Sequence, residues 1–154
     1  MIKLLDKNFS KDLWDKIYNE FKFNPSSDVN IKPFSFITSK CYKLNTVWNE
    51  AQECFVNEIF KHLSLDNIYA LDWNHDCFEF NPYDYQQMSK QWFDEDRNCN
   101  VYFPSYYPNG DYFFFVSKDF TYGLFGHPWR SEIYIIGDAL VKQFELNKEF
   151  LELS

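Results

Sequence analysis

The chain has 154 residues, a formal net charge of −8 and an aromatic content of 22%. Its length fits a single domain over residues 1–154. The 18 Phe, 11 Tyr and 5 Trp residues are too many for all of them to have a functional role, so most are expected in the core. Four cysteines without a C-x-x-C pair exclude zinc-ribbon and thioredoxin-like spacing, and the lack of an apolar leader or long apolar run predicts a cytoplasmic protein without a membrane span.

Two helices are predicted in the first part of the chain. The first is indicated by apolar residues four positions apart, with Ser10 or Asn8 as its expected cap. Its stripe consists of Phe9, Leu13, Ile17 and Phe21. The second helix is expected to begin after Asn45 or Thr46 and to run to about Leu63, with one apolar face and a charged opposite face.

Short apolar runs predict strands in the middle of the chain. The segment Pro33–Leu44 alternates loosely, as an edge strand does. The runs Ile68–Trp73 and Cys77–Phe80 are joined by Asn74-His75-Asp76, which indicates a hairpin or a bent strand pair. The segment Tyr85–Asn100 is polar and acidic, so we expect a surface loop or a short helix there.

The stretch from Pro108 to Gly137 contains all four glycines and the densest run of β-forming residues. Asn109-Gly110 is a turn signal, because both residues tolerate positive φ at low cost. The arms on either side, Val101–Tyr107 and Tyr112–Ser117, are therefore predicted to pair as a hairpin. The second arm does not alternate, which indicates a central strand covered on both faces.

A second turn follows at residues 118–123 and returns through Leu124-Phe125. Ile133–Ile136 is a further strand, and a last helix is expected with Asp138 as its cap. This order predicts an α+β fold, in which an antiparallel sheet of about five or six strands carries two N-terminal helices and one C-terminal helix.

The negative charge is concentrated in the middle of the chain. Residues 62–96 carry eight acids against Lys90, a net charge of −7, whereas residues 1–61 carry +1 and residues 97–154 carry −2. Because phosphate binding needs clustered Lys and Arg, neither nucleic acid nor an anionic membrane is an expected partner. A basic protein partner is favoured. The predicted partner-binding residues are Asp72, Asp76, Glu79, Asp84, Asp94, Glu95 and Asp96, with exposed Tyr83, Tyr85 or Trp92 as anchors.

His75 is the first of two histidines in distinctive settings. It lies near the carboxylates of Asp72, Asp76 and Glu79 in the sequence. An imidazole in such a place can act as a general base or a metal ligand. The interpretation we favour is that His75 sits in a strand connection and pairs with a neighbouring acid.

His127 belongs to the tetrapeptide Gly126-His127-Pro128-Trp129. A catalytic role would place it beside Asp111 or Asp119 as an acid or base. In the favoured structural interpretation, the glycine allows close backbone approach, the proline fixes a corner, Trp129 plugs the end of the core and His127 bonds a backbone carbonyl. The residues assigned to this structural motif are Gly110, Asp111, Gly126, His127, Pro128 and Trp129.

Motifs for nucleophilic catalysis and nucleotide binding are missing from the sequence. It contains no G-x-S-x-G, no P-loop and no G-x-G-x-x-G after a strand. We therefore expect no catalytic residue, no metal site and no cofactor.

Several motifs resemble a family of small bacterial proteins catalogued as a domain of unknown function. They are Tyr69-Ala70-Leu71-Asp72-Trp73-Asn74-His75, Pro108-Asn109-Gly110-Asp111-Tyr112, and Gly123-x-x-Gly126-His127-Pro128-Trp129 followed by Ile135-Ile136-Gly137. The resemblance implies an α+β fold and no known activity. More loosely, the order of elements is similar to the Smi1/Knr4-like immunity superfamily, which implies a cytoplasmic protein that neutralises a toxin by binding it.

Three functions are consistent with these features. The first is an immunity (antitoxin) protein that blocks a cognate, basic bacterial toxin through its acidic surface. The second is a small hydrolase-type enzyme that uses His75 and His127 with nearby carboxylates, which requires both side chains to meet in one pocket. The third is a generic protein-interaction domain.

Overall fold

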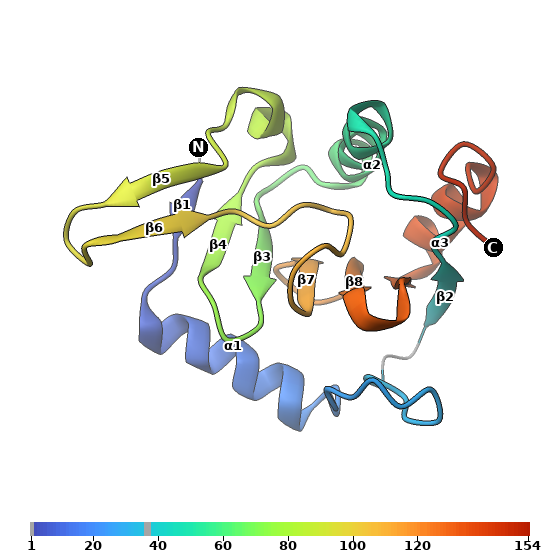
Figure 1. Cartoon of the computed structure of the whole chain (residues 1–154), viewed down its shortest axis with the longest axis horizontal. Helices are drawn as coiled ribbons and strands as arrows, with labels where there is room; N and C mark the ends of the chain where they lie inside the picture. Colours follow the sequence, from blue (N-terminus) through green and yellow to red (C-terminus); the bar gives the residue numbers. More distant parts are fainter. Residues whose placement is uncertain (1, 36–37) are drawn as a thin grey trace.

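The computed structural model describes residues 2–35 and 38–154. These residues form a seven-stranded antiparallel sheet in the order β1-β4-β3-β7-β8-β9-β2, and a separate two-stranded sheet made of β5 and β6 (Figure 1). The predicted α+β class is confirmed, but the main sheet has more strands than the five or six expected. The strands are β1 (Lys3–Leu4), β2 (Ser39–Lys43), β3 (Ile68–Asp72), β4 (Cys77–Phe80), β5 (Gln91–Asp94), β6 (Cys99–Tyr102), β7 (Phe113–Ser117), β8 (Gly123–His127) and β9 (Glu132–Ile136).

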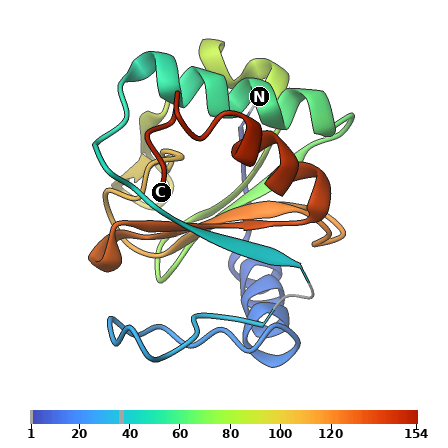
Figure 2. The same cartoon turned by 90° about the vertical axis from the view of Figure 1, so that its right-hand side faces the viewer.

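Helices cover both faces of the main sheet. In Figure 2, α2 (Glu50–Leu63) and α3 (Asp138–Leu146) lie on one face, and α1 (Lys7–Asn19) lies on the other face with the loop that follows it. Two 3₁₀ helices, η1 (Pro82–Gln87) and η2 (Pro128–Arg130), lie in connections. The fold therefore has three layers, with the sheet in the middle.

Strand β7 is the centre of the core. Its side chains alternate between the two faces: Phe113 and Phe115 pack in the cluster under α2 and α3, whereas Phe114 and Val116 pack in the cluster under α1. All four are almost completely buried. The expected central strand, covered on both faces, is confirmed, and a non-alternating aromatic run is what such a position requires.

The helix starts differ from those predicted. Helix α1 is capped by Asp6, whose side chain accepts a hydrogen bond of 2.8 Å from the backbone N–H of Phe9. Helix α2 is capped by Asn49 in a reciprocal capping box with Gln52, and α3 by Gly137. Several Asn, Ser, Thr and Asp residues near the starts of α1 and α2 satisfy the same rule, so composition alone does not select the cap there. The cap of α3 is a glycine that makes no side-chain hydrogen bond.

The predicted hairpin around Asn109-Gly110 is wrong. Val101 lies in β6, which pairs with β5, whereas β7 pairs with β3 and β8. The segment 103–112 instead crosses over the core and buries Phe103 and Tyr106. The prediction of a surface loop or short helix at Tyr85–Asn100 is only partly correct, because this segment also contains β5 and the start of β6.

The remaining strand predictions agree with the structure. The β3–β4 hairpin is present, and β7 returns as β8 through the second predicted turn. Strand β2, within the predicted segment Pro33–Leu44, is an edge strand that pairs with β9. Residues 36–37 of that segment lie outside the described residues.

Gly123 lies where strands β7 and β8 pack closely against each other. A Cβ at this position would press into the backbone carbonyl oxygen of Phe115 on β7, whereas a Cβ at Gly110 would meet nothing within 4 Å. We expect Gly123→Ala to lower the free energy of unfolding by about 1–3 kcal/mol, because a backbone atom has to move. Gly110→Ala is the matched control and should stay close to the wild type. Equal urea midpoints for the two variants would contradict this packing.

Candidate functional site

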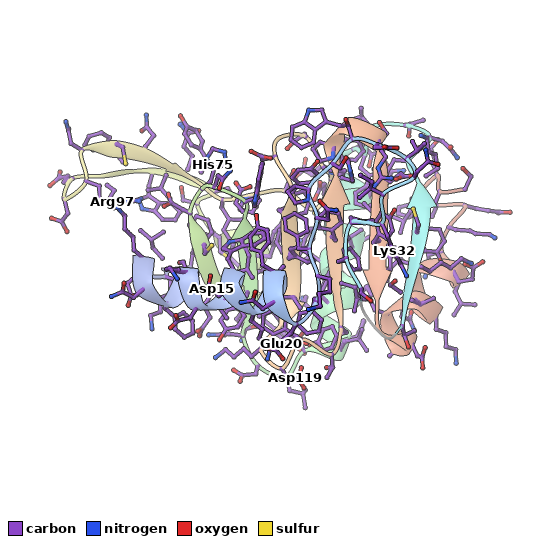
Figure 3. The ribbon with its side chains drawn as sticks, turned by 90° about the horizontal axis from the view of Figure 1, so that it is seen from below. Asp15, Glu20, Lys32, His75, Arg97 and Asp119 are labelled. Atoms are coloured by element: carbon purple, nitrogen blue, oxygen red, sulfur yellow. The ribbon has the colours of Figure 1, made fainter. Side chains whose placement is uncertain are left out.

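Polar side chains gather at the end of the sheet where β3 turns into β4 and where β7 begins. A cavity of about 480 Å³ opens there, and we call it the Asp72 cleft. It is lined by Asp72, His75, Asp76, Asn100, Tyr102, Gly110 and Asp111. A second cavity of about 250 Å³ shares Asp72, Tyr102, Gly110 and Asp111 with it. Figure 3 shows His75 and Arg97 on the side of the molecule where the β5–β6 hairpin projects.

Backbone pairing brings three distant segments together in this cleft. Asp72 is the last residue of β3 and stands opposite Phe113 at the start of β7. The N–H of Trp73 donates a hydrogen bond of 2.9 Å to the carbonyl of Tyr112. This bond holds the loop before β7 beside the β3–β4 turn. His75 Nε2 consequently lies 3.6 Å from Asp111 Oδ2.

The carboxyl group of Asp72 has an unusual protonation equilibrium. Its pKa is raised to about 7, chiefly by burial; the positive charge of His75 lowers the pKa, and the negative charges of Asp111 and Asp76 raise it. The side chain is half-buried at the base of the cleft. At neutral pH it therefore exists as a mixture of acid and carboxylate, and a cation placed beside it would favour the carboxylate.

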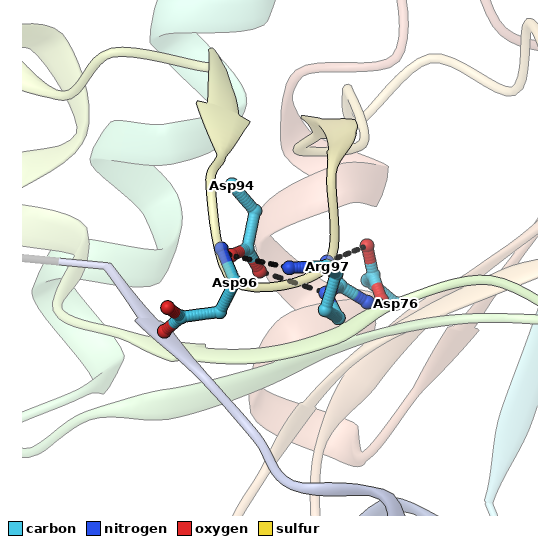
Figure 4. Close-up of polar contacts among 4 residues, drawn as sticks. All are labelled: Asp76, Asp94, Asp96 and Arg97. Atoms are coloured by element: carbon cyan, nitrogen blue, oxygen red, sulfur yellow. Dashed lines mark hydrogen bonds and ion pairs between the residues drawn. The ribbon is translucent and has the colours of Figure 1, made fainter.

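Arg97 neutralises two of the predicted partner-binding carboxylates. Its Nη1 and Nη2 donate hydrogen bonds of 2.7 and 3.0 Å to the carboxylate of Asp76, and its Nε donates one of 2.7 Å to Asp94 (Figure 4). This guanidinium holds the pKa of Asp94 below its usual value. The same contacts fasten the tip of the β5–β6 hairpin to the β3–β4 turn.

The other predicted carboxylates do not share one face with the cleft. Glu79 accepts a 2.7 Å hydrogen bond from Asn67 and lies 3.2 Å from Lys118 Nζ. Asp84 lies in η1 and lines a different cavity. Glu95 and Asp96 are exposed at the hairpin tip. Pairing with Arg97 and Lys118 therefore divides the predicted partner-binding carboxylates, and of this set only Asp72 and Asp76 line the cleft.

The predicted aromatic anchors also differ in exposure. Tyr83 is exposed, with the Lys61 ammonium 5.2 Å from its ring centre, and Trp92 is half-buried against Phe78. Tyr85 is only 5% exposed, so its expected exposure is wrong. Sequence reasoning missed Tyr102, which is 59% exposed at the rim of the cleft. The alternation of β6 around the buried Val101 was the available signal.

His127 lies outside the cleft. Its ring is completely buried, and its Nε2–H donates a 2.8 Å hydrogen bond to the backbone carbonyl of Ser26, the kind of partner expected for a structural histidine. Burial lowers its pKa. Neither cavity lined by His75 includes His127, so the two-histidine pocket required for the enzyme hypothesis is not formed by the described residues.

The other residues of the structural motif have divided roles. A Cβ at Gly126 would lie 2.5 Å from the ring of Phe113, so this glycine does allow close approach. Trp129 is 56% exposed, and its ring centre lies 4.6 Å from that of Tyr112 with the two rings tilted, so the expectation that it plugs the core is wrong. Gly110 and Asp111 line the cleft instead of closing a hairpin.

Among residues 2–35 and 38–154, no group of three or more His, Cys, Asp or Glu side chains is placed to hold a metal ion. No helix within the same ranges has the length and apolar character needed to cross a membrane.

Asp72 should make stability depend on pH. Its pKa of about 7 in the folded protein lies above the value of about 3.9 in an unfolded chain, so folding favours the protonated form. Because the folded protein binds the proton of Asp72 more tightly than the unfolded chain does, this group stabilises the fold at low pH, and that contribution is lost as the pH rises from about 4 through 7. We expect Asp72→Asn to be more stable than wild type by about 1–2 kcal/mol at pH 8, after allowance for partial exposure, and equally stable at pH 4. Urea unfolding at both pH values measures this difference. Glu95→Gln makes the same kind of carboxyl-to-amide change at an exposed site and is the control for the substitution itself. A difference between Asp72→Asn and the wild type that stays constant from pH 4 to pH 8 would contradict the assignment.

Comparison with known proteins gives a family and no activity. No solved structure gives a significant match to the chain. The "Uncharacterized protein YxiI" of Bacillus subtilis (strain 168) is 41% identical over 81 residues. That alignment covers 52% of this chain and 44% of the relative, so the chain matches less than half of the relative's length. The family described as "Protein of unknown function (DUF2716)" matches residues 4–141, which confirms the resemblance drawn from the sequence motifs. The chain therefore belongs to the DUF2716 family.

Proposed function

We propose that this protein is a cytoplasmic immunity (antitoxin) protein that binds and neutralises a basic toxin and has no catalysis of its own. The looser resemblance to the Smi1/Knr4-like immunity superfamily supports this proposal, as does the net charge of −8. The docking region differs from the one expected from sequence. It is the Asp72 cleft and the adjoining hairpin, in place of the whole acidic segment.

One observation carries the proposal. The carboxyl groups of Asp72 and Asp111 line one cleft, neither has a lysine or arginine within ion-pairing distance among the described residues, and the exposed ring of Tyr102 stands at its rim. A lysine or arginine from a partner would gain two charge-assisted contacts and an aromatic surface there. Exposed tyrosine beside desolvated charge is typical of residues that dominate binding energy at interfaces.

The burial of His127 favours this proposal over the hydrolase alternative. An acid or base has to reach the proton that it transfers, and the His127 ring has no exposed surface. A generic protein-interaction domain could use the same Asp72 cleft, so the geometry of the cleft does not separate it from an immunity protein. Rescue from toxicity distinguishes these two, because only an immunity protein protects a cell.

The test is co-expression with the protein encoded by the adjacent gene. We expect rescue of growth and co-purification with the wild type. The double variant Asp72→Lys with Asp111→Lys should slow association at least tenfold at low salt, because it reverses the charge of the cleft. The matched control is Asp15→Lys with Glu20→Lys, which makes the same charge change on α1 and at the residue that caps its C-terminus (Figure 3). Measured at the same low salt, the control should slow association less than the cleft variant does, because its charges lie outside the proposed site, and equal slowing by the two double variants would contradict that site.

Binding should also depend on pH. Because the pKa of Asp72 is raised to about 7, a cationic partner has to displace its proton below that value. Affinity should rise by about tenfold between pH 6 and pH 8 as the carboxylate forms. Isothermal titration calorimetry in buffers of different ionisation enthalpy would detect the released proton. In Asp72→Asn the rise should disappear, and a persistent rise would assign the effect to another group.

A further inference from the structure

The β5–β6 hairpin is a two-stranded sheet that projects from the main sheet (Figure 1). Strand β6 pairs with β5 and with no other strand in the described part of the chain. An edge strand of this kind presents a row of N–H and C=O groups that can pair with another chain. Strand β6, and not β5, borders the Asp72 cleft, because Asn100 and Tyr102 both line it.

The alternation of hydrogen-bonded and non-hydrogen-bonded residue pairs in the hairpin identifies which backbone groups point outward. The N–H of Phe103 donates a 2.9 Å hydrogen bond to the carbonyl of Lys90, so these residues form a hydrogen-bonded pair. The register places Val101 opposite Trp92 and Cys99 opposite Asp94, two and four residues further along. Hydrogen-bonded pairs alternate in an antiparallel ladder. The backbone N–H and C=O groups of Asn100 and Tyr102 therefore point away from β5.

Nothing described in the chain uses these outward groups. No hydrogen bond from residues 2–35 or 38–154 reaches the backbone of Asn100 or Tyr102 outside the ladder. Strand β6 is only four residues long, but it contains no proline and no lysine, two residues that natural proteins use to block an edge. The edge is therefore open to an added strand.

The charges and aromatic rings around the edge indicate which strand would fit. Asp72 and Asp111 provide negative charge along one side, and Phe93 and Tyr102 are large exposed aromatic side chains on the hairpin itself. An added strand directs alternate side chains to opposite faces. In the β5–β6 register Phe93 stands opposite Asn100, so Phe93 and Tyr102 lie on the face of the hairpin that lines the cleft. Trp92 and Val101 lie on the other face and pack against the core. Basic side chains on the first face can reach the carboxylates beside the Tyr102 ring, and apolar side chains on the second face can extend the surface of Trp92 and Val101.

We propose that the open edge of β6 accepts an extended segment of another protein that carries Lys or Arg at alternate positions with apolar residues between them. The segment pairs through its backbone with Asn100 and Tyr102. This inference rests on the proposed function for the sign of the partner's charge, and it adds the mode of binding.

The probe is a ten-residue peptide of alternating lysine and valine, capped at both ends. We expect it to shift the amide NMR signals of Asn100 and Tyr102 in the wild-type protein. Asn100→Pro removes the outward N–H while keeping β6 paired with β5, because proline is tolerated where an edge N–H faces solvent. Asn100→Ala is the matched control, since it changes the side chain and keeps the N–H. The proline variant should bind the peptide at least fivefold more weakly, and the alanine variant within twofold of wild type.

Other outcomes separate the two proposals. Strand addition is overturned if the peptide does not bind to the wild-type protein. It is also overturned if the proline variant binds the peptide as tightly as the alanine variant does. The proposed function then still stands if the adjacent-gene protein is neutralised and the Asp72→Lys with Asp111→Lys variant loses it. A peptide of alternating glutamate and valine should not bind, and equal binding of the two peptides overturns the charge requirement. Amide dispersion of the free Asn100→Pro variant establishes that it is folded.

Discussion

Burial of β7 on both faces is the constraint on which the rest of the structure depends. Phe113 and Phe115 enter one aromatic cluster, and Phe114 enters the other. A strand with no solvent-facing side requires a layer of helix or ordered loop on each side of the sheet. The positions of α1, of α2 and α3, and of the crossing segment 103–112 follow from this requirement.

The candidate site is a by-product of the same arrangement. Because β7 is central, its first residue is flanked by the end of β3 and the end of β8, and the loop before it has to lie at that end of the sheet. Asp111 occupies that loop and Asp72 ends the neighbouring strand. Two carboxyl groups that are 39 positions apart by their numbering in the sequence therefore line the same cleft. Burial there costs charge solvation, which is why the pKa of Asp72 is raised.

Local patterns predicted the elements better than they predicted the pairings. The β3–β4 hairpin, the β7–β8 turn and the double burial of β7 follow from short runs whose turn chemistry and apolar pattern agree. Asn109-Gly110 carried an equally strong turn signal, yet β7 pairs with β3, because a partner from elsewhere in the chain covers a central strand better than the preceding loop does. Charge misled for a related reason. Acids close together in sequence are spread over the end of β3, β4, η1 and the β5–β6 hairpin, and Arg97 and Lys118, which pair with some of them, come from outside the acidic segment. The exposure of Tyr102 and the open edge of β6 both depend on the pairing of β6 with β5, which the local sequence pattern does not specify.

Arg97 has a consequence beyond ion pairing. A single guanidinium sets the local charge and also fixes the angle at which the hairpin leaves the body of the protein. A substitution at this position would alter both properties at once, so the strength of the negative field there cannot be adjusted through Arg97 without also changing the direction of the hairpin. Charge and shape at this end of the sheet are thus a single inherited trait of one side chain.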